Sequence, residues 1–186
     1  MRLEYAAAEP FPASQICAKS RLNCDAWIRP RDVGLPAALR LVDMTHVNPS
    51  DDELREILSM YRVIAMVGAS ARHDRPSIGV MKVLLAAGFD VIPVTPRESS
   101  ILGRTTYPSL TDVPVPVDIV DVFRRADDTP PIADDAARIG AKVLWLQSGI
   151  VSEEAATRAR AAGLSVIMDL CIGITTSRLG IKHAKA

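Results

Sequence analysis

The sequence predicts an α/β domain in which a five-stranded, mainly parallel sheet lies between two layers of helices. Short apolar runs alternate with amphipathic segments of about 10 to 12 residues, which is typical of βαβ units. Aromatic residues make up only 4% of the 186 residues, so the core must be aliphatic. An aliphatic core suits parallel strands that are covered on both faces.

Five apolar runs are expected to be the strands: residues 63–67, 91–94, 118–123, 142–147 and 164–168. Pro93 in the second run favours an edge strand or a strand end, because proline cannot donate to a sheet hydrogen bond. Parallel strands joined through helices need right-handed crossovers. The pattern therefore predicts a Rossmann-like three-layer domain.

Start and stop signals mark the helices between these strands. The first helix begins at a capping box, in which Ser50 and Glu53 satisfy free backbone donors. Helices are also expected over residues 77–87, 130–140 and 152–163, and a glycine ends each of them at little conformational cost: Gly88, Gly140 and Gly163. Residues 96–116 are expected to form a loop with a single turn near Ser109.

The first 43 residues differ from the rest of the chain. They contain Pro10, Pro12, Pro30 and Pro36 and two of the three cysteines, and they show no sustained periodicity. We expect a poorly ordered extension, followed by the folded domain over residues 44–186. Translation from Met44 and a genuine flexible tail both remain open explanations.

Composition excludes several classes of protein. The formal net charge is zero, which argues against a dedicated nucleic-acid or anionic-membrane binder. The three cysteines form no CxxC pair, so a reducing cytoplasm is expected rather than a disulfide framework or zinc site. No apolar run approaches the roughly 20 residues of a membrane span, and the N-terminus lacks signal-peptide features.

In such a fold, ligands bind beyond the carboxyl ends of the strands. The loop after the first strand carries Gly68, Ala69 and Ser70, and small residues let a phosphate approach the backbone. Arg75 adds charge, and Ser77 opens the next helix. The loop matches neither GxGxxG nor the Walker A sequence, so an ordinary strand–helix turn is the alternative.

Three further strand ends complete the predicted crevice. Thr95, Pro96 and Arg97 follow the second strand, where NAD-binding proteins place an acid. A cation there favours a ligand with a phosphorylated ribose, such as coenzyme A (CoA) or NADP, although a solvated arginine is the alternative. Phe123 and Arg124 follow the third strand, with Phe123 more typical of core. Gln147, Ser148 and Gly149 form a small polar turn at the end of the fourth strand. The glycine would let a narrow chain, such as a pantetheine arm, pass close to the backbone.

Catalytic groupings are poorly supported. Ser70, His73 and Asp74 lie too close together in one loop to form a triad. Cys171 follows the fifth strand and is expected to be a buried structural thiol. We therefore assign neither catalytic nor metal-binding residues.

By the order and spacing of eight stretches, the chain resembles the stand-alone CoA-binding domain proteins. This family includes the bacterial YccU-type proteins and is similar to the CoA-binding domain of the succinyl-CoA synthetase α subunit. The eight stretches are residues 64–70, 74–77, 91–96, 101–103, 107–110, 117–125, 140–147 and 166–169. The resemblance implies that Gly68, Ala69 and Ser70 line a CoA phosphate loop. It places Thr95, Pro96 and Arg97 near the adenosine 3′-phosphate. It also implies contacts from Val122, Phe123, Arg124, Gln147, Ser148 and Gly149.

Two departures from the family pattern bear on activity. After Asp169 the family commonly carries Arg, Cys and a basic–acidic pair, whereas this chain has Leu170 and Cys171 followed by Ile172. The synthetase also needs a second domain with a phosphorylatable histidine, for which the chain that ends at Ala186 has no room. The expected function is CoA or acyl-CoA binding without catalysis, as a carrier, sensor or regulator.

Two other functions remain open. The chain can be read as an enzyme, either a small NADP-dependent oxidoreductase or one part of a multi-chain acyl-CoA ligase. It can also be read as an interaction scaffold that keeps the fold with a degenerate site. The sequence identifies no protein partner.

Overall fold

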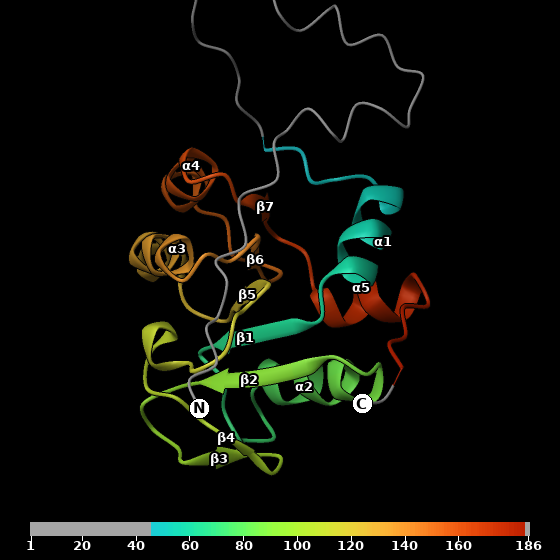
Figure 1. The fold of residues 1–186 in the computed structure, drawn as a ribbon, viewed down its shortest axis with the longest axis vertical. Coiled ribbons are helices and arrows are strands. Elements are labelled where there is room, and N and C mark those ends of the chain that lie inside the picture. Colours follow the sequence, from blue (N-terminus) through green and yellow to red (C-terminus); the bar gives the residue numbers. More distant parts are fainter. Residues whose placement is uncertain (1–45, 185–186) are drawn as a thin grey trace, which may run out of the picture. The chain divides into compact units, whose positions relative to one another are not determined.

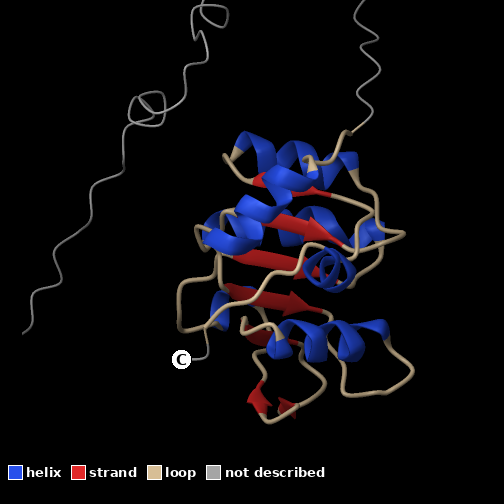
Figure 2. Ribbon diagram, turned by 90° about the vertical axis from the view of Figure 1, so that its right-hand side faces the viewer, coloured by secondary structure: helices blue, strands red, loops and turns tan. Residues whose placement is uncertain are grey.

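The structure, a computed structural model, describes residues 46–184. Its centre is a sheet of five parallel strands in the order β2–β1–β5–β6–β7. The strands are β1 (Val63–Val67), β2 (Asp90–Val94), β5 (Ile119–Val122), β6 (Val143–Leu146) and β7 (Ser165–Ile167). They run in the same direction (Figure 2), so their carboxyl ends meet at one edge. The predicted fold class is confirmed.

Helices cover both faces of this sheet. One layer contains α1 (Asp51–Met60), α2 (Pro76–Ala86) and α5 (Ile172–Arg178). The other contains α3 (Thr129–Arg138) and α4 (Glu153–Ala161). Figure 1 shows α3 and α4 on the left of the strands and α1 and α5 on the right.

The core divides into two aliphatic layers because side chains alternate across each strand. In β5, Ile119 packs toward α1, α2 and α5, whereas Val120 packs toward α3 and α4. In β6, Trp145 and Leu144 divide in the same way. Trp145 is fully buried, and its indole nitrogen donates a hydrogen bond of 2.6 Å to the Leu170 carbonyl oxygen.

Local signals in the sequence are realised in the structure. The capping box is formed: the Glu53 amide donates to Ser50 Oγ, and the Ser50 amide donates to Glu53 Oε2 at 2.8 Å. Gly88 ends α2 with φ of 90°, and a Cβ there would collide with the His183 carbonyl oxygen. The edge position predicted from Pro93 is confirmed, since β2 is the first strand of the sheet.

The strands β3 (Ser100–Ile101) and β4 (Arg104–Thr105) and the helix α5 were not expected from the sequence. Residues 96–116 contain an antiparallel hairpin of β3 and β4, besides the single turn η3 (Leu110–Asp112). Strands of two residues are too short to show alternation. The helix α5 was also missed, because it is short and contains Gly173, and its packing against α2 stabilises it.

The expectation for residues 1–43, a poorly ordered extension with a start at Met44, lies outside the described residues. Within residues 46–184, no helix combines the length and the apolar character that crossing a membrane requires.

Candidate functional site

A cleft of about 1050 Å³ opens at the carboxyl ends of β1, β2, β5 and β6. The chain leaves β1 toward β2 on one side and returns to β5 on the other. The sheet order thus reverses between β1 and β5, and this is where open α/β sheets bind ligands. The cleft therefore lies at the position that strand-end reasoning selects.

The turn after β1 depends on glycine at position 68. Gly68 has φ of 85°, a conformation that other residues adopt only with strain. A Cβ there would lie 3.1 Å from both the Phe123 carbonyl oxygen and Arg124 Cδ. Glycine thus brings the loop after β5 against the loop after β1, and both loops line the cleft.

The start of α2 offers a backbone donor to this cleft. Pro76 occupies the first turn, and Arg75 at the N-cap makes no side-chain hydrogen bond to the helix. Pro76 has no N–H, and the Ile78 amide donates to the Arg75 carbonyl oxygen at 3.3 Å. Among the described residues, the Ser77 amide is thus the donor of this turn that is left for an anion. Ser77 lines the cleft, and its hydroxyl is buried without a hydrogen-bond partner among the described residues.

Glu98 is the residue that sequence reasoning missed. Its carboxylate accepts hydrogen bonds from the Ala71 amide at 2.9 Å and from Ser70 Oγ at 3.2 Å. A carboxylate thus occupies the hydroxyl of Ser70, which belongs to the predicted phosphate loop, and the amide of the next residue, Ala71. The sequence does show this acidic residue directly after Arg97. It lies one residue beyond the predicted binding segment at the end of the second strand, Thr95 to Arg97.

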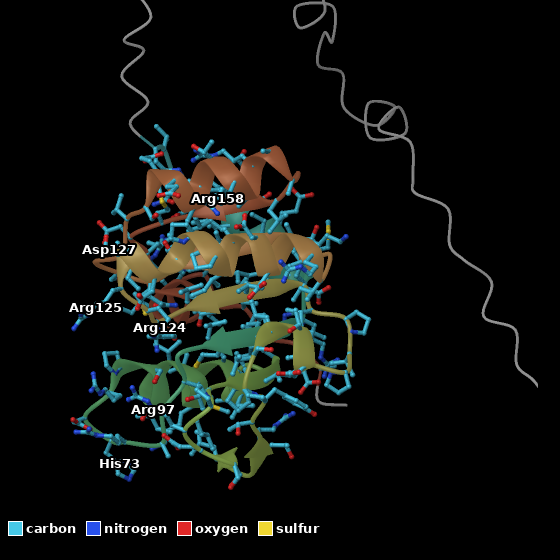
Figure 3. The ribbon with its side chains drawn as sticks, turned by 90° about the vertical axis from the view of Figure 1, so that its left-hand side faces the viewer. His73, Arg97, Arg124, Arg125, Asp127 and Arg158 are labelled. Carbon is cyan, nitrogen blue, oxygen red and sulfur yellow. The ribbon has the colours of Figure 1, made fainter. Side chains whose placement is uncertain are left out.

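Four arginines line the cleft: Arg72, Arg75, Arg97 and Arg124. Arg72 pairs with Asp74 at 2.7 Å and Arg124 with Asp128 at 3.3 Å. Within residues 46–184, Arg75 and Arg97 make no ion pair. Figure 3 labels Arg97, Arg124 and Arg158 on one face of the molecule, with Arg158 on α4.

Acidic and apolar side chains also line the cleft. Asp127, Asp128 and Asp135 line it from the turn η4 (Ala126–Asp128) and from α3. Leu110 and Ile132 supply apolar surface nearby. Asp128 pairs with Arg124, so acidic and basic side chains lie next to each other in the cleft.

A buried carboxyl group stands behind the cleft. Asp121 in β5 is fully buried, and it accepts a hydrogen bond of 2.6 Å from Gln147 Nε2. Its second oxygen has no partner among the described residues. Burial raises the pKa of Asp121 to about 7, because a carboxylate loses its hydration there, and the hydrogen bond from Gln147 opposes this shift. Gln147 itself lines the cleft.

Twelve of the fourteen predicted binding residues line this cleft: Gly68, Ala69, Ser70, Arg75, Ser77, Thr95, Pro96, Arg97, Phe123, Arg124, Gln147 and Ser148. Val122 and Gly149 do not. The Val122 side chain is buried in the core under α3 and α4, and the Gly149 amide donates to Asp169 Oδ1 at 2.6 Å.

The groups considered for catalysis have other partners. Asp74 pairs with Arg72, and Ser70 with Glu98, so they form no triad with His73. Cys171 was expected to be buried, but it is half-buried and lines the cleft. Within residues 46–184, no group of three or more His, Cys, Asp or Glu side chains is placed to hold a metal ion.

Comparison with known proteins gives concordant matches. The profile of the CoA binding domain family matches residues 62–177. The uncharacterized protein YneT of Bacillus subtilis is 43% identical over 127 residues, which are 68% of this chain and 94% of YneT. A hypothetical protein from Pyrococcus horikoshii has a solved structure with a TM-score of 0.69 and 40% identity, covering 70% of this chain and 92% of that one.

A larger relative shares part of this region. An ADP-forming acetate–CoA ligase of Archaeoglobus fulgidus is 31% identical over 93 residues, which are 49% of this chain and 14% of the ligase. Most of that enzyme therefore has no counterpart in the match. The profile match over residues 62–177, together with the similarity to YneT along nearly its whole length, shows that this chain belongs to the CoA-binding domain family.

Proposed function

We propose that the protein binds coenzyme A, or an acyl-CoA, in the cleft at the carboxyl ends of the strands. The observation that carries this proposal is the glycine turn at Gly68, next to the start of α2, where no side chain caps the helix, and to Arg75 and Arg97, which make no ion pair within residues 46–184. Backbone donors and guanidinium groups are the groups that hold a pyrophosphate. The family match favours CoA over other nucleotides.

The Glu98 carboxylate would have to move before a phosphate can bind to the loop after β1. A phosphate that reaches the Ala71 amide and Ser70 Oγ must displace the Glu98 carboxylate, which accepts hydrogen bonds from both. The exchange keeps these two donors satisfied. Its cost is the loss of the contact that joins Glu98 to the loop after β1.

We further propose that the protein acts without catalysis, as a carrier, sensor or regulator in the cytoplasm. The pairing of Asp74 with Arg72 and of Ser70 with Glu98 supports this, since neither carboxylate is free to act as a base on the hydroxyl. The similarity to the acetate–CoA ligase favours a second candidate, one part of a multi-chain acyl-CoA ligase. Formation of acyl-CoA from acid, CoA and nucleotide by the purified chain would favour catalysis.

Calorimetric titration with CoA, dephospho-CoA, NADP and NAD tests the ligand. We expect CoA to bind more tightly than dephospho-CoA, because only CoA carries the 3′-phosphate that we place beside Arg97. NADP should bind more weakly than CoA, and NAD more weakly still. Binding of NADP without binding of CoA would overturn the proposal, and so would the absence of binding for all four ligands.

Replacing Arg97 tests the position of the 3′-phosphate. Arg97→Ala should raise the Kd for CoA about tenfold, which is the effect of one charge-assisted hydrogen bond. The Kd for dephospho-CoA should hardly change. Arg125→Ala is the matched control, because Arg125 is a neighbouring arginine that does not line the cleft. Equal losses for both ligands would discredit the position assigned to Arg97.

A further inference from the structure

A second hollow lies along the seam between α2 and α5. It measures about 740 Å³ and is lined by Pro76, Gly79, Val80, Val83, Cys171, Gly173, Ile174, Ser177 and Arg178. We call it the α2–α5 groove. Pro76, Gly79, Val80 and Val83 recur at the spacing of one helix face, so the groove follows the axis of α2.

Two glycines shape this groove. Gly173 lets α5 approach α2 closely, since a Cβ there would lie 3.3 Å from Val80 Cγ1. Gly79 lies inside α2, where glycine costs roughly 1 kcal/mol relative to alanine. A Cβ at Gly79 would meet nothing within 4 Å. A larger side chain at position 79 would therefore stand in the groove.

The lining favours a hydrocarbon over a polar ligand. Its two polar side chains have partners within the chain: Ser177 Oγ donates to the Gly173 carbonyl oxygen at 2.9 Å, and Arg178 Nη2 donates to Asp51 Oδ1 at 2.8 Å. The apolar side chains are open to solvent, with Ile174 68% and Val83 36% exposed. A hydrocarbon chain that lies in the groove would bury this apolar surface and be favoured by the hydrophobic effect.

The groove continues from the cleft. Four residues line both hollows: Pro76, Val80, Cys171 and Ile174. From Pro76 to Val83 the groove follows α2 for about 10 Å at the helical rise per residue. An extended chain of about eight carbons has the same length.

We propose that the α2–α5 groove holds the acyl chain of a medium-chain acyl-CoA whose nucleotide lies in the cleft. This inference rests on the proposed binding of CoA and names the class of ligand. A thioester that leaves the cleft past Cys171 and Ile174 enters the groove directly. The acyl chain would cover the exposed side chains of Val83 and Ile174.

Calorimetry with CoA and with acetyl-, butyryl- and octanoyl-CoA tests the inference. In the unaltered protein the Kd should fall about fourfold for each methylene group that the groove buries. Gly79→Leu should abolish this gain and leave the Kd for CoA itself unchanged, since Gly79 does not line the cleft. Gly79→Ala is the matched control: it adds one methyl group and should keep most of the gain.

The outcomes separate this inference from the proposed function. Failure of CoA itself to bind would overturn both. Binding of CoA with equal Kd at every chain length, or a chain-length gain that survives Gly79→Leu, would overturn the groove alone. A dimer that Gly79→Leu dissociates, without any chain-length effect, would overturn it in favour of a second copy of the chain as the occupant.

Discussion

Asp121 shows how one residue acquires an unusual environment. Alternation along β5 places its carboxyl group on the same face as Ile119, inside the layer formed by α1, α2 and α5. Within the described part of the chain, Gln147 alone supplies a hydrogen bond to it. An ionised carboxylate is disfavoured there, so its pKa rises from 3.8 to about 7.

This pKa predicts a pH-dependent stability. The folded protein holds the Asp121 proton more tightly than the unfolded chain, so the contribution is complete below the unfolded pKa and is lost as the pH rises through about 7. Asp121→Asn stays neutral and can still accept from Gln147. At about pH 8 we expect the variant to be more stable by on the order of 3 kcal/mol.

Urea unfolding of both proteins between about pH 4 and pH 8 measures this effect. The free energies of unfolding should be similar at the acid end and diverge toward neutrality. Parallel curves across this range would show that Asp121 is ionised in the folded protein. Asp127→Asn, an exposed change at the cleft margin, is the control for general charge effects.

The hydrogen bonds of Glu98 could not be predicted from the residues around it in the sequence. The sequence shows an acid beside Arg97, but its partners lie 27 and 28 residues earlier in the chain. No local pattern reports the direction of a loop side chain. Gly68 was recognised, by contrast, because a glycine at the end of a strand indicates a tight turn directly.

At the scale of elements, the Glu98 contact joins the segment after β2 to the loop between β1 and α2. Thr106 strengthens this arrangement, since its hydroxyl bonds to the Glu98 carbonyl oxygen and its amide donates to Ser99 at 3.1 Å. The hairpin of β3 and β4 thus holds the backbone of Glu98 in place. Its carboxylate is the part that we propose CoA displaces.

Glu98→Ala tests this displacement. Removing the competing carboxylate and its negative charge should lower the Kd for CoA about three- to tenfold, as one exposed charge contact contributes about 1 kcal/mol. Calorimetry gives the Kd, and Glu53→Ala is an acidic control distant from the cleft. A higher Kd in Glu98→Ala would show that the carboxylate instead holds the ligand, for instance at ribose hydroxyls.

At the scale of the whole molecule, binding at the strand ends should stabilise the domain. The cleft joins loops that follow β1, β2, β5 and β6, so a ligand there contacts segments that separate on unfolding. CoA at about 100 times its Kd should add near 2.7 kcal/mol to the free energy of unfolding. Thermal unfolding with CoA, NADP and NAD side by side measures this gain.

The pattern of these shifts is diagnostic. A rise in Tm that grows with the concentration of CoA, and is smaller with Arg97→Ala, fits binding in the cleft. An unchanged Tm at high CoA would contradict the predicted stabilisation. The three ligands share an adenosine diphosphate group, so equal shifts would point to recognition of that group alone.

The sequence by itself determined the five strands of the parallel sheet, four of the five α-helices within residues 46–184, and the strand ends at which the cleft opens. These features depend on periodicity, caps and glycine turns, such as Ser50 and Gly88, which act over a few neighbouring residues. The tertiary structure alone decided the pairing of Glu98 with the first loop, the burial of Asp121 against Gln147, and the groove that α5 forms with α2. Those contacts join residues far apart in the chain, and only the packing of the helices on the sheet brings them together.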